Sequence, residues 1–161
     1  MQLRLVKKCE LDIVLKLYKE AQKSPFCVWN DEYPTKNEID VDYETNNLFV
    51  YVNNDEVVGA ISIVPINEMD DCLEWKIKDN VCEIARIVIS KKHHGKNLAY
   101  GMVKEIFDIC IKRSFKAVHL SCQKDNIPAI KTYQKLGFEF VGEKFMYNYQ
   151  YYLCEKNLEN C

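Results

Sequence analysis

Residues 81–101, VCEIARIVISKKHHGKNLAYG, contain the change of pattern on which the fold prediction depends. Residues 81–90 are mostly apolar and β-branched, which predicts a strand buried on both faces. A basic loop with one glycine, residues 91–96, comes next. From Asn97 to about Arg113, apolar residues recur at helical spacing, which predicts a helix. Strand, glycine loop and helix therefore follow one another without a linker.

The junction between this loop and the helix is a candidate anion site. The first backbone N–H groups of a helix have no partner within it, and the helix dipole adds positive potential at the same end. Neither the G-x-G-x-x-G nor the G-x-x-x-x-G-K-[ST] phosphate motif is present. An ordinary solvated basic loop therefore remains an alternative for this segment. The potential cations of the loop are Lys91, Lys92, His93, His94 and Lys96.

Over the whole chain, predicted strands and helices alternate in the order β-α-α-β-β-β-α-β-α-β-β. This order predicts a single mixed α/β domain over residues 1–161, with its core from about 3 to 153. The first helix is expected to bury a face with Ile13, Leu17 and Ala21. The expected strands are 3–6, 48–52, 57–64, 81–90, 117–122, 138–141 and 145–152, and the expected helices are 13–23, one beginning near 35, 97–113 and 126–136.

The composition is that of a soluble globular protein, with 48% apolar and 29% charged residues, five Gly and four Pro. Eight cysteines without a C-x-x-C pair predict neither a metal site nor a redox dithiol. No apolar run approaches the roughly 20 residues of a membrane span, and the N-terminus lacks the apolar region of a signal peptide. We therefore expect a cytoplasmic protein that does not contact membranes.

The formal charge of −2 conceals an uneven distribution along the chain. Residues 31–83 hold three basic and fourteen acidic side chains, net −11, whereas residues 1–30 carry +3 and residues 84–161 carry +6. One interpretation is a solvated acidic face with its counter-charges nearby. The other is a protein that handles an anion with one part and a cation with another. Near-neutrality overall disfavours nucleic acid as a partner.

Two further segments hold candidate catalytic residues. Glu83 lies among apolar strand residues, where burial would raise its pKa and suit a general base, although the wet end of a strand is the alternative. Residues 125–138, DNIPAIKTYQKLGF, predict a helix that is capped by Asn126 and ends at Gly137. Tyr133, near the end of this helix, is by its local pattern a core residue.

Together these segments resemble the GNAT family of N-acetyltransferases. The family pattern N-x-x-A-x-x-x-Y-x-x-x-G-F is present as Asn126, Ala129, Tyr133, Gly137 and Phe138. The resemblance covers nearly the whole chain. It implies the single-domain GNAT fold, which is a mixed, mostly antiparallel sheet with splayed parallel central strands, flanked by helices.

The pyrophosphate loop of the family, Q/R-x-x-G-x-G/A, falls on residues 94–99. His94 stands in place of Gln or Arg, and Asn97 stands in place of the first Gly. Asparagine adopts left-handed backbone angles more readily than most residues, so we expect it to replace glycine here. These two departures raise the alternative of a CoA-binding regulatory module with weak or no turnover.

The resemblance implies acetyl-CoA as the cofactor, in the gap between the splayed strands 81–90 and 117–122. A main-chain N–H near Val88 would polarise the thioester carbonyl, and the N–H groups from Gly95 to Tyr100 would hold the pyrophosphate. Asn126 would contact the pantetheine arm. The implied cofactor-binding residues are Ile87, Val88, Ile89, His94, Gly95, Lys96, Asn97, Leu98, Ala99, Tyr100 and Asn126.

By the same resemblance, Tyr133 would protonate the departing CoA sulfur and Glu83 would be the base that deprotonates the amine. Phe26, Trp29 and Tyr33, with Glu83, would line the acceptor site, unless the aromatic residues form a lid packed on the sheet. Acidic and aromatic residues suit a cation, so we expect a small primary amine, an amino-acid derivative or a polyamine. Acetylation of a protein N-terminus or lysine is the alternative. A monomer or a homodimer is expected.

Overall fold

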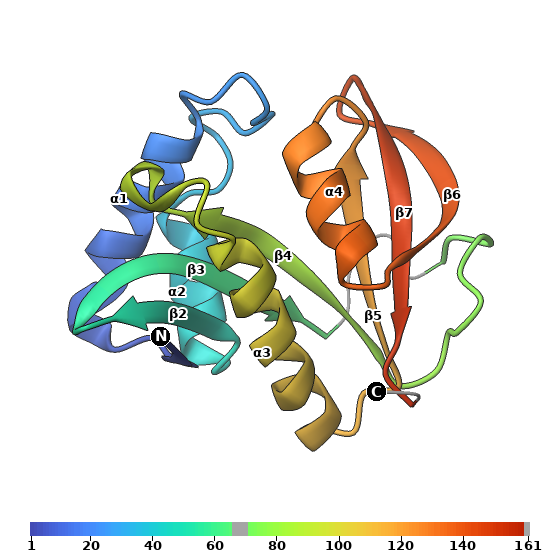
Figure 1. Ribbon diagram of the computed structural model, residues 1–161, viewed down its shortest axis with the longest axis horizontal. Helices are drawn as coiled ribbons and strands as arrows, with labels where there is room; N and C mark the ends of the chain where they lie inside the picture. The colour runs from blue at the N-terminus through green and yellow to red at the C-terminus, as the bar shows by residue number, and fades with distance from the viewer. Residues whose placement is uncertain (66–70, 160–161) are drawn as a thin grey trace. The chain divides into compact units, whose positions relative to one another are not determined.

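The computed structural model describes residues 1–65 and 71–159, and the chain divides into two compact units (Figure 1). Unit 1 contains Met1–Ile63 and Ala85–Val103, and unit 2 contains Val64–Ile84 and Lys104–Cys161. The predicted order of strands and helices is confirmed. The single domain over residues 1–161 stays a prediction.

The elements have the following bounds. The strands are β1 Gln2–Leu5, β2 Leu48–Asn53, β3 Glu56–Val64, β4 Val81–Ile89, β5 Ala117–Gln123, β6 Glu139–Met146 and β7 Tyr149–Asn157. The helices are α1 Leu11–Ala21, α2 Lys36–Glu44, α3 Leu98–Lys112 and α4 Ile127–Lys135, with short 3₁₀ turns η1 Lys8–Glu10 and η2 Lys91–His93.

The hydrogen-bonded strand order is β1-β2-β3-β4-β5-β7-β6. The pairs β1–β2, β2–β3, β5–β7 and β6–β7 are antiparallel. Strands β4 and β5 are parallel and pair from Val81 with Ala117 to Glu83 with His119. The expected mixed, mostly antiparallel sheet with parallel central strands is thus confirmed, and the splay of these strands stays a prediction.

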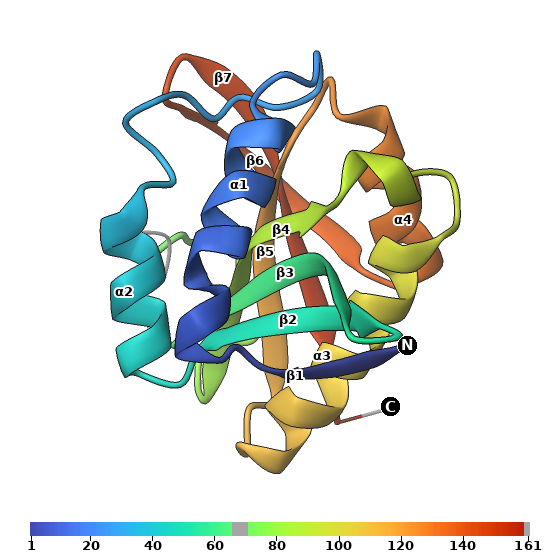
Figure 2. The same ribbon diagram turned by 90° about the vertical axis from the view of Figure 1, so that its left-hand side faces the viewer.

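In unit 1, helices α1 and α2 cover one face of strands β1, β2 and β3 (Figure 2). The buried face of α1 consists of Val14, Leu17 and Tyr18. Ile13, which the sequence placed on this face, is 40% exposed, so that prediction was wrong. Steps of four residues advance by about 40° around a helix, so a stripe must alternate steps of three and four to stay on one face.

Helix α2 begins where its sequence predicts, because residues 35–38 form a capping box. Thr35 Oγ1 accepts a hydrogen bond from the N–H of Asn37 at 3.2 Å. Glu38 Oε2 accepts from the N–H of Thr35 at 2.6 Å. These two bonds satisfy donors that would otherwise lack a partner at the helix start.

In unit 2, the closing hairpin differs from its prediction. The turn lies at Tyr147–Asn148, where both residues have positive φ, and not before Phe145. Gly142, which follows the first of the two expected strands, lies at a register shift inside β6. A Cβ at Gly142 would come within 2.6 Å of Glu74 Cγ, so a bulge and a close approach, rather than a turn, account for this glycine.

The core reaches past residue 153, because β7 continues to Asn157 and Leu158 is 4% exposed. Strand β4 is only partly buried, against the expectation of burial on both faces. Its buried residues are Cys82, Ile84 and Val88, and the others are partly exposed.

Seven cysteines lie in the described ranges and all are free thiols, five of them buried. Cys9 is exposed, and Cys161 lies outside the described residues. Within residues 1–65 and 71–159, no three His, Cys, Asp or Glu side chains lie close enough together to hold a metal ion. No helix in this part of the chain has the length and apolar character needed to span a bilayer.

Candidate functional site

The loop between β4 and α3 is held in an unusual backbone conformation. Gly95 and Asn97 have φ values of 77° and 59°, both in the left-handed region. The loop is exposed from His94 to Asn97, and α3 begins at Leu98. The expectation that Asn97 takes the conformation for which the family uses glycine is thus confirmed.

Hydrogen bonds tie this loop to the strands of unit 1. The N–H of Ser90 donates to Val58 O at 2.8 Å. His94 Nε2 lies 2.8 Å from Ile89 O, so the imidazole bonds back to the strand that precedes the loop. The exposed loop, with its lysines and the N-terminus of a 15-residue helix, suits a pyrophosphate group.

The first turn of α3 approaches β2 closely at Gly101. A Cβ at this position would lie 2.8 Å from Tyr51 Oη. At Gly59 in β3, a Cβ would lie 2.8 Å from Val88 O. Glycine at these two positions lets the backbone around Ile87–Ile89 and the start of α3 pack against β2 and β3.

A buried ion pair in unit 1 was not predicted from the sequence. Arg86 Nε and Nη2 donate to Asp42 Oδ2 and Oδ1 at 2.9 and 2.8 Å. Ser62 Oγ donates to Asp42 Oδ2 at 2.6 Å. Burial alone would lower the pKa of Arg86, but Tyr33 and Asp42 raise it above its usual value, so the guanidinium stays charged.

The loop of residues 24–34, between α1 and α2, contains the predicted acceptor residues. Trp29 is partly buried and packs edge-on against buried Tyr18 of the core, with ring centroids 5.5 Å apart. Phe26 and Tyr33 are 43% and 40% exposed. The Tyr33 hydroxyl accepts a hydrogen bond from Arg86 Nη1 at 3.1 Å. The roles of Phe26, Trp29 and Tyr33 at an acceptor site, or in a lid, stay predictions.

Several acids of the net −11 segment have partners. Asp31 pairs with Lys19 at 3.0 Å, and Asp42 with Arg86. Glu38 is part of the cap of α2. Glu32 is exposed in the loop of residues 24–34.

In unit 2, α4 has the expected cap and end. Asn126 Oδ1 accepts from the N–H of Ala129 at 3.2 Å, and Gly137 has φ 77°. Tyr133 packs edge-on against Phe138, with ring centroids 5.6 Å apart. Burial raises the pKa of Tyr133, so its hydroxyl stays protonated at neutral pH.

Glu83 lies at one end of a row of titratable residues that crosses three strands of unit 2. It pairs in register with His119, and His119 pairs with Glu155. His119 Nε2 is 3.0 Å from Glu155 Oε2, and both side chains are almost fully buried. Trp75 stacks on the imidazole at 3.9 Å. Glu155 Oε2 also accepts from the N–H groups of Lys76 and Ile77, at 3.1 and 3.0 Å.

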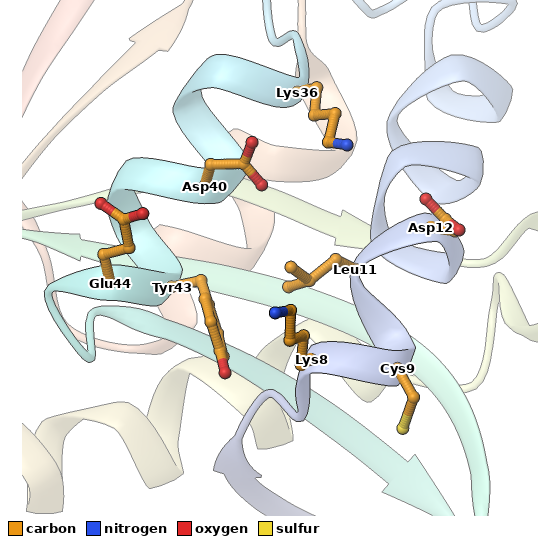
Figure 3. A pocket seen from close by; sticks show the side chains of 8 residues that line it. All are labelled: Lys8, Cys9, Leu11, Asp12, Lys36, Asp40, Tyr43 and Glu44. Atoms are coloured by element: carbon orange, nitrogen blue, oxygen red, sulfur yellow. The ribbon is translucent and has the colours of Figure 1, made fainter.

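A separate cavity of about 430 Å³ lies in unit 1 between the start of α1 and helix α2 (Figure 3). Side chains of both charge signs line it, and it contains none of the predicted site residues. Its lining residues are Lys8, Cys9, Leu11, Asp12, Lys36, Asp40, Tyr43 and Glu44.

Comparison with known proteins identifies the family. The model of the acetyltransferase (GNAT) family matches residues 14–138. The chain belongs to the GNAT acetyltransferase family. Spermidine N(1)-acetyltransferase of Escherichia coli K12 is 30% identical to this GNAT chain over 113 residues, which are 67% of this chain and 55% of the relative. The matched segments span between 37% and 55% of the length of such curated relatives.

Solved structures with the same fold match almost the entire GNAT chain. An N-acetyltransferase from Staphylococcus aureus Mu50 superposes with a TM-score of 0.78, at 21% identity over 98% of both chains. The protein yncA from Salmonella typhimurium, solved with its cofactor acetyl-CoA, has a TM-score of 0.78 at 17% identity over 98% of this chain and 94% of its own. The GNAT fold expected from the sequence is therefore confirmed.

The structure places the predicted site residues in both units. Unit 1 holds the strand segment Ile87–Ile89, the loop from His94 to Tyr100 and the predicted acceptor residues Phe26, Trp29 and Tyr33. Unit 2 holds Glu83, Asn126 and Tyr133. Sequence reasoning missed Asp42 and Ser62, which are distant from Arg86 in the chain. An arginine in an otherwise apolar strand was the one available signal, because such a charge needs a partner.

Proposed function

We propose that this protein is an N-acetyltransferase that transfers the acetyl group of acetyl-CoA to the primary amine of a small molecule. The observation that carries the proposal is the left-handed loop at Gly95 and Asn97, which leads into the N-terminus of α3 in a chain of the GNAT family. Such a loop directs backbone N–H groups toward an anion, as the pyrophosphate of the cofactor requires.

The residues fit the cofactor, and we assign them as follows. The backbone from Gly95 to Tyr100 would hold the pyrophosphate, Ile87–Ile89 the pantetheine arm, and Asn126 the same arm through its side-chain amide. Acetyl-CoA supplies a thioester whose acetyl group can pass to an amine. Lys91, Lys92 and Lys96 would meet phosphate or remain in solvent.

Two protons must move in this reaction, and two side chains of unit 2 are assigned to them. An amine is cationic at neutral pH, so it must lose a proton before it can attack, and Glu83 would accept that proton. Tyr133 Oη would hold the proton that the departing thiolate needs. A tyrosine hydroxyl is protonated at neutral pH, and burial raises the pKa of Tyr133 further, so this proton is present at the working pH.

The substrate class proposed is a polyamine or an amino-acid derivative. Curated relatives that act on spermidine or spermine support a polyamine. The exposed aromatic side chains of Phe26 and Tyr33, together with Glu32, offer cation–π and charge contacts to an ammonium group. Asp42 is not assigned to the amine, because its carboxylate is already neutralised by Arg86.

Steady-state turnover tests the proposal. Release of CoA would be measured with spermidine, spermine, a set of amino-acid amides, and a peptide with a free N-terminus. We expect turnover with at least one of the small amines. Turnover confined to the peptide would assign a protein substrate, and turnover confined to anionic acceptors would contradict the proposal.

Calorimetric titration with CoA, combined with the turnover measurement, separates the enzyme from the regulatory module. Both would bind CoA, but only the enzyme would release it from acetyl-CoA in the presence of an amine. Binding without turnover across the whole amine panel would favour the module.

A further inference from the structure

We propose that Arg86 is a positioning residue that fixes the loop of residues 24–34 for amine binding, acting through the hydroxyl of Tyr33. This inference rests on the proposed function, because it concerns how the acceptor amine is held. It assigns a role to a buried ion pair that the reaction itself does not use.

All three guanidinium nitrogens of Arg86 have partners. Nε and Nη2 form a bidentate contact with Asp42 at 2.9 and 2.8 Å. Nη1 donates to Tyr33 Oη at 3.1 Å. A planar group bound at three nitrogens on two sides cannot rotate without breaking several bonds, so the position of the phenol oxygen is fixed by the ion pair.

Burial makes this arrangement rigid. The side chains of Arg86 and Asp42 are 10% and 9% exposed, and Ser62 donates a further bond to Asp42 at 2.6 Å. In a buried site, hydrogen bonds to charged groups are stronger than at the surface. Tyr33, by contrast, is 40% exposed, so it connects the buried ion pair with the protein surface.

The backbone of Arg86 gives a second observation. Its φ of 52° lies in the left-handed region, which is unfavourable for a residue with a long side chain. Such a conformation persists where the surrounding contacts hold it, and it occurs often at functional sites. Arg86 directly precedes Ile87–Ile89, the segment assigned to the cofactor, so one residue joins that segment to the loop of residues 24–34.

Tyr33 belongs to a narrow turn within this loop. Asn30 and Tyr33 exchange two backbone hydrogen bonds, at 3.1 and 3.2 Å, which form a narrow turn. Tyr33 therefore fixes the turn on one side and reaches Arg86 on the other. Loss of the phenol–guanidinium bond would free the turn while the Arg86–Asp42 pair remains.

Steady-state kinetics of Tyr33→Phe, Arg86→Lys and the double variant test the proposal, with Tyr149→Phe as the control because that tyrosine is 43% exposed on β7. We expect both single variants to raise the acceptor KM about tenfold, the effect of losing one charge-assisted hydrogen bond. The KM for acetyl-CoA should change less than about twofold. The double variant should be no worse than the worse single variant, because both changes break the same link.

Three outcomes would overturn the proposal. They are an unchanged acceptor KM in Tyr33→Phe, effects that multiply in the double variant, and a KM for acetyl-CoA that rises as much as that of the amine. Tyr33→Phe leaves the ion pair intact, so it decides the matter even if Arg86→Lys does not fold.

Hydrogen exchange gives a readout that does not depend on activity. The backbone amides of Asn30 and Tyr33 should exchange about tenfold faster in Tyr33→Phe than in the wild type and in Tyr149→Phe. Unchanged exchange would remove the positioning role. Faster exchange in a protein that turns over none of the amines would support the positioning of the loop and contradict the proposed enzyme, so the two failures can be told apart.

Discussion

Tyr133 combines a protonated hydroxyl with an aromatic anchor. The ring of Tyr133 packs on that of Phe138, and the ring centroids of Phe138 and Phe107 are 5.7 Å apart. Apolar contacts therefore set the position of the Tyr133 ring. Burial raises its pKa, and the thiols of Cys122 and Cys154 act in the same direction. The residue therefore has the properties of an acid that is kept protonated by its surroundings.

Tyr133→Phe should lower kcat by roughly 10²-fold or more, the usual scale of acid assistance, while the melting temperature stays close to that of the wild type. An acid loses activity when it is deprotonated, and the folded pKa is raised. The fall of kcat caused by this group should therefore lie above pH 10, the ordinary value for tyrosine. A pH profile of kcat with a matched profile of Tyr133→Phe checks both statements, and equal turnover in the two proteins would exclude Tyr133 from the reaction.

Asn97 provides a prediction about backbone strain. The φ of 59° at Asn97 is a left-handed conformation, which destabilises the folded state by about 1–2 kcal/mol for most residues with a Cβ. Asparagine is one of the residues that tolerate it best. Asn97→Gly should unfold in urea at an equal or slightly higher concentration than the wild type, whereas Asn97→Val should lose about 1–2 kcal/mol. The CoA affinity should follow the same order. A valine variant as stable as the wild type would show that the loop relaxes out of this conformation.

Glu155 connects two parts of unit 2, because it binds the segment before β4 to the sheet. One carboxylate oxygen binds His119 of β5 and the backbone at Lys76 and Ile77. Trp75 covers this arrangement and packs with Cys72 and Leu153. The segment 72–77 is thereby fixed by charge, stacking and apolar contact together.

Glu155→Gln should reduce the free energy of unfolding by about 1–3 kcal/mol, the usual cost of disturbing a buried polar group that holds several hydrogen bonds. Glu139→Gln is the matched control, since Glu139 pairs in register with Glu155 and forms an exposed ion pair with Lys76. That change should cost at most about 1 kcal/mol. Urea unfolding of both variants tests the contrast, and equal losses would mean that the buried pair contributes no more than the surface pair.

The elements also show how far the sequence could predict this molecule. Helices with explicit end signals were located well: Asn126 and Gly137 delimit α4, and Thr35 starts α2. The β6–β7 hairpin was misplaced because its turn, Tyr147–Asn148, contains neither Gly nor Pro, and because β6 continues through a bulge at Gly142 beyond the expected strand end at residue 141. Local sequence signals are reliable where neighbouring residues, such as a helix cap or a terminal glycine, themselves fix the backbone conformation.

Contacts between residues that are distant in the sequence could not be predicted from such local signals. The loop at Gly95 and Asn97 was predictable because its residues are contiguous and its family pattern is known. The pairing of Arg86 with Asp42 depends on how β4 and α2 meet in unit 1, which no local pattern reports. The sequence could indicate only that Arg86 required a partner.

For the molecule as a whole, binding of the cofactor should increase the free energy of unfolding. A ligand that binds only the folded chain stabilises it by about 2.7 kcal/mol when present at 100 times its dissociation constant. For a chain of this size, that corresponds to a rise in melting temperature of roughly 5–10 °C. Thermal unfolding with CoA should show this rise, whereas a matched concentration of pantetheine should show much less, because it lacks the phosphates. Equal shifts with both compounds would contradict a role for the basic loop.

The charge distribution acquires a more specific meaning at this scale. The lysines of the basic loop, Lys91, Lys92 and Lys96, are exposed before α3, as an anion site requires. Some carboxylates of the acidic segment already form ion pairs within the protein, since Asp31 and Asp42 have cationic partners. Attraction of a cationic amine would therefore depend on few acids, and its KM should rise only moderately with added salt.

The distribution of thiols also determines how the protein behaves toward sulfhydryl reagents. Of the cysteines in the described ranges, Cys9 alone is exposed, and burial raises the pKa of Cys122 to about 12 and also raises that of Cys27. Thiolates are the reactive form, so among these seven cysteines alkylation should begin at Cys9 and reach the buried thiols only on unfolding. A fluorescent maleimide attached there would report from the turn before α1, and Cys9→Ser would lower the protein's own background when released CoA is followed by its thiol.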